Sequence, residues 1–442
     1  MHLFVTDGNL RSTLAVVRGL GSNGVSVTVG AETASSLAGS SRYCRERVQY
    51  PSPLKEPRRF QEFLLGRLAD CPAVLLPMSD ITVRLAAEVA PDLMASRARW
   101  PFASQECVEQ VQDKRHVLRV AASLGITCPD ELLPEGSAIE DVAPRLRYPV
   151  VLKPRFSRYL QTDSWIKGQV RYAHNPAELI NVYHACNRLI PDPLVQEWIE
   201  GVGCGVFLLL WDGELKAAFA HQRLREKPPA GGVSVLCESS PLDDRLVAQC
   251  ATLLSALCWQ GPAMVEFKRN RSGQPVLMEV NGRFWGSLQL ALDAGMNFPA
   301  LLYRLATGEM VSPRFDYRVG IRSRWLLGDF SQMLQRLLCR SSVGHIGPGD
   351  SRFRAVREFF DFGDQAVRLE NPRRDDLGPF WSECASYLGK RMLPADWILA
   401  GARATRVPSV EQVPAARDLR FSPKSFAPLT GAIDREGGTG GK

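Results

Sequence analysis

Two glutamates and one asparagine stand where they could share a divalent metal ion. The strand-like runs Met264–Lys268 and Val276–Asn281 are joined by a short polar turn, which predicts a β-hairpin. In that hairpin Glu266 lies opposite or diagonal to Glu279 and shares its face, because side chains alternate along a strand. Asn281 lies two residues further along the same face. Carboxylate and amide oxygens are the donors that magnesium and manganese prefer.

The same glutamates have a second interpretation. Two carboxylates in an otherwise apolar hairpin repel each other unless a positive charge lies between them, and a metal ion supplies one. They could instead lie on the solvent side of a half-buried sheet, with the alternate apolar residues in the core. These alternate residues are Val265, Phe267, Leu277 and Val280. The residues alone leave both interpretations open.

Other chemistries lack their usual patterns. The six histidines form no HxxxH or HxH pair, which disfavours a dedicated zinc site. The eleven cysteines include no CxxC pair, and the N-terminus lacks a signal-peptide pattern, so we expect reduced thiols in a cytoplasmic protein. No GxSxG nucleophile motif occurs. No apolar stretch approaches the roughly 18 residues of a membrane span.

A GxGxxG match at Gly19–Gly24 is misleading. A dinucleotide-binding fingerprint must follow a strand and open a helix. Here the match follows the helical pattern of Leu10–Leu20 and precedes the strand-like run Val25–Val29. We therefore interpret it as a helix C-terminus followed by a turn, and not as a nicotinamide site.

The elements that must position the glutamates alternate between strand and helix signals. The strand-like runs Leu3–Thr6, Val25–Val29 and Ala73–Leu76, with a helix at Leu10–Leu20, predict a parallel sheet covered by helices. Further on, a helix begins at Asp113. Later strands are predicted at Tyr148–Pro154, Leu194–Ile199, Gly205–Trp211 and Leu215–His221, and a helix at Arg245–Leu257.

The hairpin motif resembles that of a known family. Glu279–Arg283 matches the ExNxR signature of the ATP-grasp superfamily, with Glu266 as the preceding metal carboxylate. The following helix at Ser287–Gly295 and the Asn297–Pro299 segment are similar to carbamoyl-phosphate synthetase-like members and carboxylate–amine ligases. The resemblance covers about residues 106–310.

This resemblance implies an α/β fold of the α+β grasp type. The expected parts are an N-terminal parallel-sheet pre-ATP-grasp domain (Rossmann-like) over residues 1–105, a two-part ATP-grasp domain with a small subdomain over 106–190 and a catalytic subdomain over 191–312, a C-terminal extension over 313–400, and a disordered tail over 401–442.

The resemblance also implies roles for single residues, with ATP and Mg²⁺ (or Mn²⁺) as cofactors. The metal ligands would be Glu266, Glu279 and Asn281. Lys114 and Lys153 would contact the nucleotide phosphates, and Lys153 and Arg283 would act in catalysis at the transferred phosphoryl group. The adenine hinge would consist of Gln196, Glu197, Trp198, Ile199 and Glu200. Arg223, Arg225 and Lys227 would hold the acceptor substrate.

Two segments depart from the family pattern. The phosphate-covering loop is often rich in glycine, but Arg155–Gly168 contains only one glycine. Its positive charge could come from Arg155, Arg158 or Lys167. Only Glu200 is acidic near the hinge, which leaves the ribose contact undefined.

The implied activity is ATP-dependent ligation. A carboxylate would be activated as an acyl phosphate and coupled to an amine, with release of ADP and phosphate. The alternatives are an ATP-grasp enzyme that phosphorylates or carboxylates its substrate, and a non-catalytic nucleotide-binding module. The expected partners are small-molecule carboxylates and amines, with no nucleic acid, and a homodimer stays open.

The basic charge is concentrated in the last third of the chain. The chain has 54 Lys and Arg against 47 Asp and Glu, a net charge of +7, and residues 313–442 contain 21 and 15 of these. This excess is either a solvated surface or a contact for an anionic partner. The amphipathic helix expected at Trp325–Leu338 packs on the domain or forms a dimer. Alternatively, it makes a peripheral contact with anionic lipid.

Overall fold

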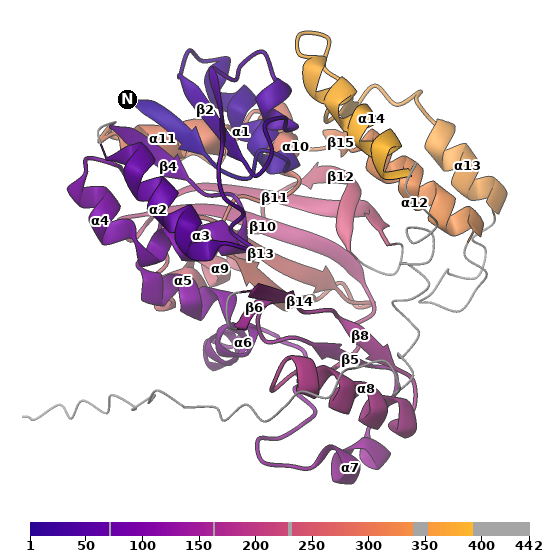
Figure 1. Ribbon diagram of the computed structural model, residues 1–442. Coiled ribbons are helices and arrows are strands. Elements are labelled where there is room, and N and C mark those ends of the chain that lie inside the picture. Colours follow the sequence, from indigo (N-terminus) through magenta and orange to yellow (C-terminus); the bar gives the residue numbers. More distant parts are fainter. Residues whose placement is uncertain (70–71, 162–163, 229–231, 339–351, 392–442) are drawn as a thin grey trace, which may run out of the picture. The chain divides into compact units, whose positions relative to one another are not determined.

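The N-terminal strands form a parallel sheet, as predicted, and it has four strands in the order β3-β2-β1-β4 (Figure 1). The computed structural model describes the whole chain except residues 70–71, 162–163, 229–231, 339–351 and 392–442. The elements of this region are β1 (His2–Val5), α1 (Arg11–Gly21), β2 (Val27–Ala31), η1 (Ala38–Ser40), β3 (Glu46–Gln49), α2 (Pro57–Leu68), β4 (Ala73–Leu76), α3 (Asp80–Glu88), α4 (Ala90–Ala95) and α5 (Gln105–Gln112).

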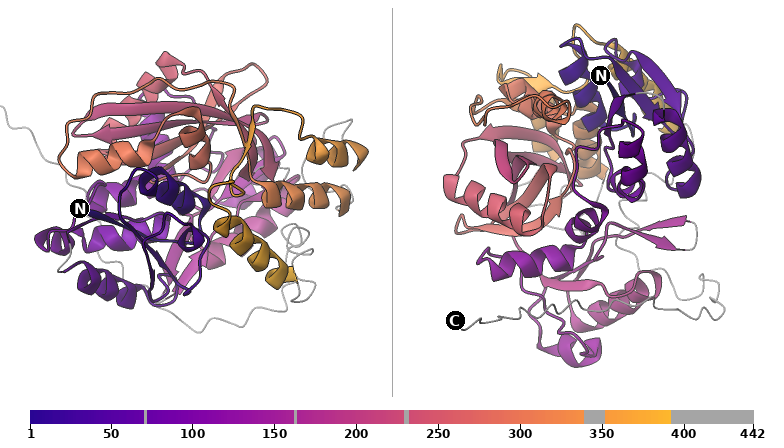
Figure 2. Two further views of the ribbon diagram at one scale, coloured as in Figure 1. Left: turned by 90° about the horizontal axis from the view of Figure 1, so that it is seen from above. Right: turned by 90° about the vertical axis from the view of Figure 1, so that its left-hand side faces the viewer.

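Helices cover both faces of this sheet (Figure 2). The apolar side of α1 packs on Leu3, Val5 and Val27, whereas α2 and α3 pack on the face that carries Phe4 and Leu75. The GxGxxG match lies at the end of α1 and before β2, which confirms its interpretation as a helix C-terminus and turn.

The next region forms a small antiparallel sheet in the order β8-β5-β9, with a separate hairpin of β6 and β7. Helix α8 packs on one face of this sheet through Leu179 and Val182. The elements are α6 (Lys114–Ser123), α7 (Ile139–Val142), η2 (Ala143–Arg145), β5 (Val150–Lys153), β6 (Arg158–Gln161), β7 (Ser164–Lys167), β8 (Arg171–Ala173), α8 (Pro176–Leu189) and β9 (Leu194–Glu197).

A seven-stranded sheet in the order β14-β13-β10-β11-β12-β15-β16 forms the largest part of the core. Strands β10 and β11 are joined at Asp212 and Gly213, whose φ values of 50° and 77° give the turn that twisted hairpins favour. The elements are β10 (Val202–Trp211), β11 (Glu214–Lys227), β12 (Val233–Ser240), α9 (Asp244–Ala256), β13 (Gly261–Arg269), β14 (Pro275–Asn281), α10 (Leu288–Ala294) and α11 (Phe298–Ala306).

The C-terminal extension completes this sheet. Strand β15 (Arg322–Arg324) pairs with β12, and β16 (Val367–Leu369) pairs with β15. Neither strand was predicted from the sequence, because a strand of three residues is too short to show an alternation of apolar and polar side chains. The extension also contains α12 (Leu326–Leu338), α13 (Arg352–Phe360) and α14 (Gly378–Arg391). Helix α12 packs against β11, β12 and α13. The expected tail at 401–442 lies outside the described residues.

Buried ion pairs tie the extension to α1. The guanidinium of Arg18 donates from Nε to Asp376 Oδ2 at 2.8 Å and from Nη1 to the Glu370 carbonyl at 2.7 Å. Asp376 also accepts from Ser41 Oγ at 2.8 Å and from the Arg42 N–H at 2.9 Å. Both Arg18 and Asp376 are buried, so each charge depends on the other for compensation.

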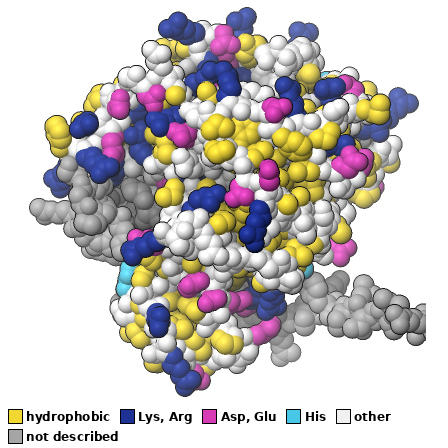
Figure 3. Space-filling view, turned by 180° about the vertical axis from the view of Figure 1, so that it is seen from behind, with side chains coloured by type: hydrophobic (Ala, Val, Ile, Leu, Met, Phe, Trp, Pro, Cys, Tyr) yellow, Lys and Arg dark blue, Asp and Glu magenta, His cyan; other side chains and the backbone are white. Residues whose placement is uncertain are grey.

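The surface shows no single-sign patch on the face that Figure 3 displays, where basic and acidic side chains are interspersed. Within the part of the chain that the structure describes, no helix combines the length and the apolar character needed to cross a membrane.

The Arg18–Asp376 pair predicts a specific loss of stability. Asp376→Asn leaves the Arg18 charge buried without its counter-charge, which should lower the free energy of unfolding by about 3–5 kcal/mol. Asp375→Asn is the matched control, because the neighbouring Asp375 lies at the surface and pairs with the Tyr43 hydroxyl. The control should cost less than about 1 kcal/mol in urea unfolding. Equal losses in both variants would contradict the prediction.

Candidate active site

The β13–β14 hairpin places the predicted metal ligands together. Glu266 and Glu279 are directly paired, and Asn281 is paired with Met264, two positions along the same face. The Glu266 and Glu279 side chains are 20% and 30% exposed. Both carboxylates therefore lie on a half-buried face, where an unpaired negative charge would be costly.

Glu279 lies among positive groups. Lys114 Nζ is 3.5 Å from Glu279 Oε2, and Asn281 Nδ2 donates to Oε1 at 3.1 Å. Burial opposes the charged carboxylate, but Lys114, the Asn281 amide and Lys153 outweigh it and lower the pKa of Glu279 to about 2. Glu279 is therefore ionised at neutral pH.

Glu266 has a separate basic partner. Arg223 Nη2 lies 2.6 Å from Glu266 Oε2, and Arg223 Nη1 donates to Glu226 Oε1 at 2.9 Å. Burial raises the pKa of Glu266, against the opposing effect of Arg223. The positive charge that the paired glutamates require is thus supplied by side chains from β11 and α6.

The donor set fits a hard divalent cation. It combines two carboxylates and one amide oxygen on one face, with the solvent exposure that an exchanging ligand needs. Among the described residues, no group of three or more His, Cys, Asp or Glu side chains converges in a way that could hold a metal ion. A cation here would therefore depend on Asn281 and on the nucleotide to complete its coordination.

Lys114 and Lys153 approach the same face from two other elements. Lys114 is the first residue of α6, whose N-cap Asp113 accepts from the backbone N–H groups of Arg115 and His116. Lys153 ends β5, and its Nζ lies 3.9 Å from Met278 Sδ. Burial lowers the pKa of Lys153, while the nearby Glu279 carboxylate raises it. Both predicted phosphate contacts therefore lie beside the predicted metal ligands.

A bidentate ion pair fixes the segment that follows β5. Arg155 Nε donates to Asp113 Oδ1 and Oδ2, each at 2.8 Å. Lys114 Nζ donates to Ser157 Oγ at 3.1 Å. The start of the segment predicted to cover the phosphates is thus attached to the N-terminus of α6.

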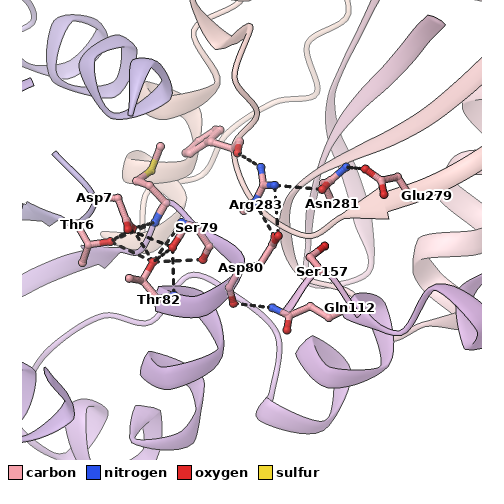
Figure 4. Close-up of polar contacts among 12 residues, drawn as sticks. Thr6, Asp7, Ser79, Asp80, Thr82, Gln112, Ser157, Glu279, Asn281 and Arg283 are labelled. Atoms are coloured by element: carbon pink, nitrogen blue, oxygen red, sulfur yellow. Dashed lines mark hydrogen bonds and ion pairs between the residues drawn. The ribbon is translucent and has the colours of Figure 1, made fainter. Parts of the chain in front are cut away.

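Arg283 faces the N-terminal sheet (Figure 4). Its Nε donates to Asp80 Oδ1 at 2.6 Å, its Nη2 donates to Asn281 Oδ1 at 3.1 Å, and its Nη1 donates to the Phe284 carbonyl at 3.0 Å. The nearby carboxylate of Asp80 raises the pKa of Arg283 against the effect of burial. Arg283 is therefore held in one orientation by Asp80 at the start of α3 and by groups at and after the end of β14.

The predicted hinge lies at the end of β9. Gln196 is only 1% exposed, and neither polar atom of its side chain has a hydrogen-bond partner among the described residues. The Glu197 N–H donates to the Asp130 carbonyl at 3.2 Å, and Lys268 Nζ donates to the Ile199 carbonyl at 3.2 Å. Two of the backbone groups expected to meet adenine thus already have protein partners.

The three basic residues expected at the acceptor substrate diverge. Arg223 binds Glu266, at the predicted metal site. Arg225 Nη2 donates to the buried Asp329 at 2.8 Å, in the extension. Lys227 Nζ lies 5.5 Å from the centre of the Trp325 ring. The structure therefore does not gather them into one anion site, and Arg225 has a partner that suits a structural role.

Several residues around this site were not predicted from the sequence. Asp80, Arg84 and Gln112 line a pocket together with Lys114, Ser157 and Asn281. Asp80 follows the predicted strand β4, and polar residues at the carboxyl ends of parallel strands commonly face a ligand. The position of Asp80 after β4 could therefore have identified it from the sequence as a candidate site residue.

A tryptophan attaches the β6–β7 hairpin to the N-terminal domain. Trp165 Nε1 donates to the Pro53 carbonyl at 3.1 Å, and the Arg84 guanidinium lies 5.6 Å from the Trp165 ring centre. Trp165 also packs against the apolar cluster that contains Phe60 and Leu85. Side-chain contacts thus hold the β6–β7 hairpin against the N-terminal elements.

Known proteins are similar to this chain in part of the sequence and in the fold. Residues 190–327 match a family model described as "ATP-grasp in the biosynthetic pathway with Ter operon". This stretch, residues 190–327, therefore belongs to the ATP-grasp superfamily. A search of curated proteins finds no match.

Solved structures share the fold at low sequence identity. The L-amino acid ligase from Bacillus licheniformis is 17% identical, with 70% of this chain and 75% of that chain covered and a TM-score of 0.54. The biotin carboxylase domain of the Hydrogenobacter thermophilus 2-oxoglutarate carboxylase, with MgADP, ADP and bicarbonate, is 15% identical, with 72% of each chain covered and a TM-score of 0.57. The Staphylococcus aureus N5-carboxyaminoimidazole synthetase, with ADP, is 14% identical, with coverage of 73% and 80% and a TM-score of 0.55.

The Trp165 contacts predict a change in the local opening of the β6–β7 hairpin. Trp165→Ala should release the β6–β7 hairpin, so limited trypsin cleavage after Arg158 and Lys167 should accelerate by about 3- to 10-fold. Trp381→Ala is the control, because Trp381 is exposed on α14. A hairpin that resists trypsin equally in both variants would show that Trp165 does not hold it.

Proposed function

We propose that this chain is an ATP- and magnesium-dependent ligase that activates a carboxylate as an acyl phosphate and couples it to an amine. The observation that carries the proposal is the convergence of Glu266, Glu279 and Asn281 with Lys114 and Lys153 on one face. The carboxylates and the amide suit a cation, and the lysines suit the phosphates of a nucleoside triphosphate. These groups come from separate elements of the fold.

The proposed metal ligands are Glu266, Glu279 and Asn281. Their present basic partners, Arg223 and Lys114, balance the carboxylates in the structure as described. When bound, magnesium supplies neutralisation of phosphate charge during phosphoryl transfer. Lys114 and Lys153 add positive charge at the phosphates from the other side, and their placement on the helix start and the strand end limits their movement.

The chemistry has two balanced steps. A carboxylate oxygen attacks the γ-phosphorus of ATP, and the bond between the γ-phosphorus and the β-phosphate oxygen breaks to release ADP. The amine nitrogen then attacks the acyl carbon, the bond between the acyl carbon and the phosphate oxygen breaks to release inorganic phosphate, and the amine loses a proton. Arg283, whose fork is fixed by Asp80 and Asn281, stabilises negative charge on the transferred phosphoryl group. No protein side chain needs to become covalently modified.

The nucleotide base has a proposed site at β9. The residues from Gln196 to Glu200, which include Trp198, would meet adenine, and the unpartnered amide of the buried Gln196 side chain supports a polar ligand nearby. The substrate roles of Arg223, Arg225 and Lys227 stay predictions, as do the homodimer, the cytoplasmic location and the peripheral lipid contact.

Two of the similar proteins differ in the acid that their descriptions mention. One is described as an L-amino acid ligase, and another holds bicarbonate in its solved complex. The first supports coupling to an amine, and the second keeps carboxylation as the alternative reaction. An assay that varies the acid separates the two.

The proposal predicts which products form. With ATP, magnesium, a carboxylate pool and an amine pool, the full-length chain should release ADP and phosphate, and a chelator should abolish the release. AMP and pyrophosphate would contradict the acyl-phosphate mechanism and indicate adenylation. ADP release that needs bicarbonate and no other acid would favour carboxylation.

A variant locates the reaction in the proposed site. Glu279→Gln should lower kcat/KM by about 10²- to 10³-fold, as for loss of a group that stabilises transferred charge. The matched control is Glu214→Gln, since Glu214 lies on an exposed turn beside Lys216. If both variants kept the activity of the unaltered chain, the proposed metal site would be wrong.

A further inference from the structure

The turn that follows β14 carries two of the proposed site residues. The Arg283 N–H donates to the Asn281 carbonyl at 2.9 Å, so the chain makes a γ-turn with Gly282 at its centre. This turn brings the Arg283 guanidinium to the Asn281 side chain, where Nη2 donates to Oδ1 at 3.1 Å (Figure 4). The position of Gly282 therefore determines where both side chains lie.

Gly282 borders both a pocket and a buried aromatic ring. It lines the pocket together with Lys114, Ser157 and Asn281. A Cβ built on Gly282 would be 2.5 Å from Cη2, 2.8 Å from Cζ2 and 2.9 Å from Cζ3 of Trp259, and real Cβ contacts are not this short. Gly282 does not have a left-handed φ, so the ring, and not the backbone conformation, requires a glycine here. Trp259 does not line the pocket and can act on it only through Gly282.

The Trp259 ring is held by the end of α9. Cys258 adopts a left-handed φ of 50°, and the N–H groups of Cys258 and Trp259 donate to the carbonyls of Ser255 and Leu254, each at 2.9 Å. These bonds form a Schellman motif, which fixes the direction in which the chain leaves the helix. Trp259 is 4% exposed and packs edge-on against Phe102, with ring centres 6.4 Å apart. A ring fixed in this way can resist displacement of the turn.

The indole nitrogen of Trp259 takes no part in this arrangement. Nε1 is buried and has no hydrogen-bond partner among the described residues. A buried tryptophan N–H usually has such a partner. What the side chain contributes here is therefore the size and shape of its six-membered ring, whose outer atoms are the ones that approach Gly282.

We propose that Trp259 is a positioning residue for this turn. Its ring supports Gly282 from the side of the core, and this support places Asn281 among the proposed metal ligands and Arg283 at the transferred phosphoryl group. The inference rests on the proposed function for the roles of Asn281 and Arg283, and it adds a residue outside the hairpin that determines their position. Because a displacement of about 1 Å can cost about 100-fold in rate, loss of the support should change both binding and turnover.

The first experiment adds and removes volume at this contact. Gly282→Ala, Trp259→Phe and the double variant are made in the full-length chain, and the MgADP affinity is measured by calorimetry beside kcat for ADP release. Gly282→Ala should lower the affinity about 10-fold and kcat about 100-fold, because the new methyl group displaces the turn. In the double variant the smaller Phe ring leaves room for the methyl group, so about 5-fold or more of each loss should be regained. Losses that multiply in the double variant would overturn the proposal.

The second experiment separates positioning from general stability, and it does not need Gly282→Ala to fold. Trp259→Phe removes no hydrogen bond from the described residues, and it should lower the MgADP affinity about 3- to 10-fold. Leu253→Val is the matched control, because Leu253 is fully buried on α9 and the closest contacts of Gly282 are all with Trp259.

The control should lower the midpoint of urea unfolding to a similar extent, because it also removes buried apolar volume. Its MgADP affinity should stay within about 2-fold of the unaltered chain, since distant sites act independently. If both variants change the affinity equally, Trp259 only fills the core, and the inference fails.

The two proposals fail in different ways. MgADP binding that follows the expected pattern, without ADP release with any acid, would contradict the proposed function and leave the role of Trp259 standing. ADP release with losses that multiply between Gly282 and Trp259 would support the ligase and contradict the role of Trp259.

Discussion

The direct pairing of Glu266 with Glu279 across β13 and β14 is the constraint on which the site depends. Two carboxylates on one half-buried face require compensating positive charge, and the fold supplies it from elements distant in sequence. Arg223 comes from β11, Lys114 from α6 and Lys153 from β5. The register of one hairpin therefore determines where three other elements must present their basic side chains.

Elements of the N-terminal region contact the candidate site directly. Asp80 binds Arg283, and the β6–β7 hairpin contacts the domain through Trp165. On the other side, Arg18 binds Asp376 of the C-terminal extension, and Arg11 binds Glu370. Ion pairs between buried charges depend on the orientation of both side chains. They therefore favour one arrangement of these elements over many loosely packed arrangements.

Local sequence patterns were sufficient to predict the elements that have a clear hydrophobic periodicity or a clear turn motif. The parallel N-terminal sheet, the strands at Gly205–Trp211 and Leu215–His221, and the placement of Glu266 beside Glu279 were predicted and are confirmed. Strands β15 and β16 were missed, because each has three residues and pairing with a neighbour stabilises it. The ion pair between Arg225 and Asp329 could not be predicted either, because the two residues lie far apart in the sequence.

By itself the sequence determined the family motif, the hairpin and the residue types that could bind a nucleotide and a metal, because these depend on side-chain identity and short-range spacing. Only the tertiary structure decided which charges meet. Lys114 reaches Glu279, Arg223 reaches Glu266 and Asp80 reaches Arg283 across separations that no local period encodes. Ion pairs and pockets of this kind depend on distances in space, and those follow from how the sheets and helices pack.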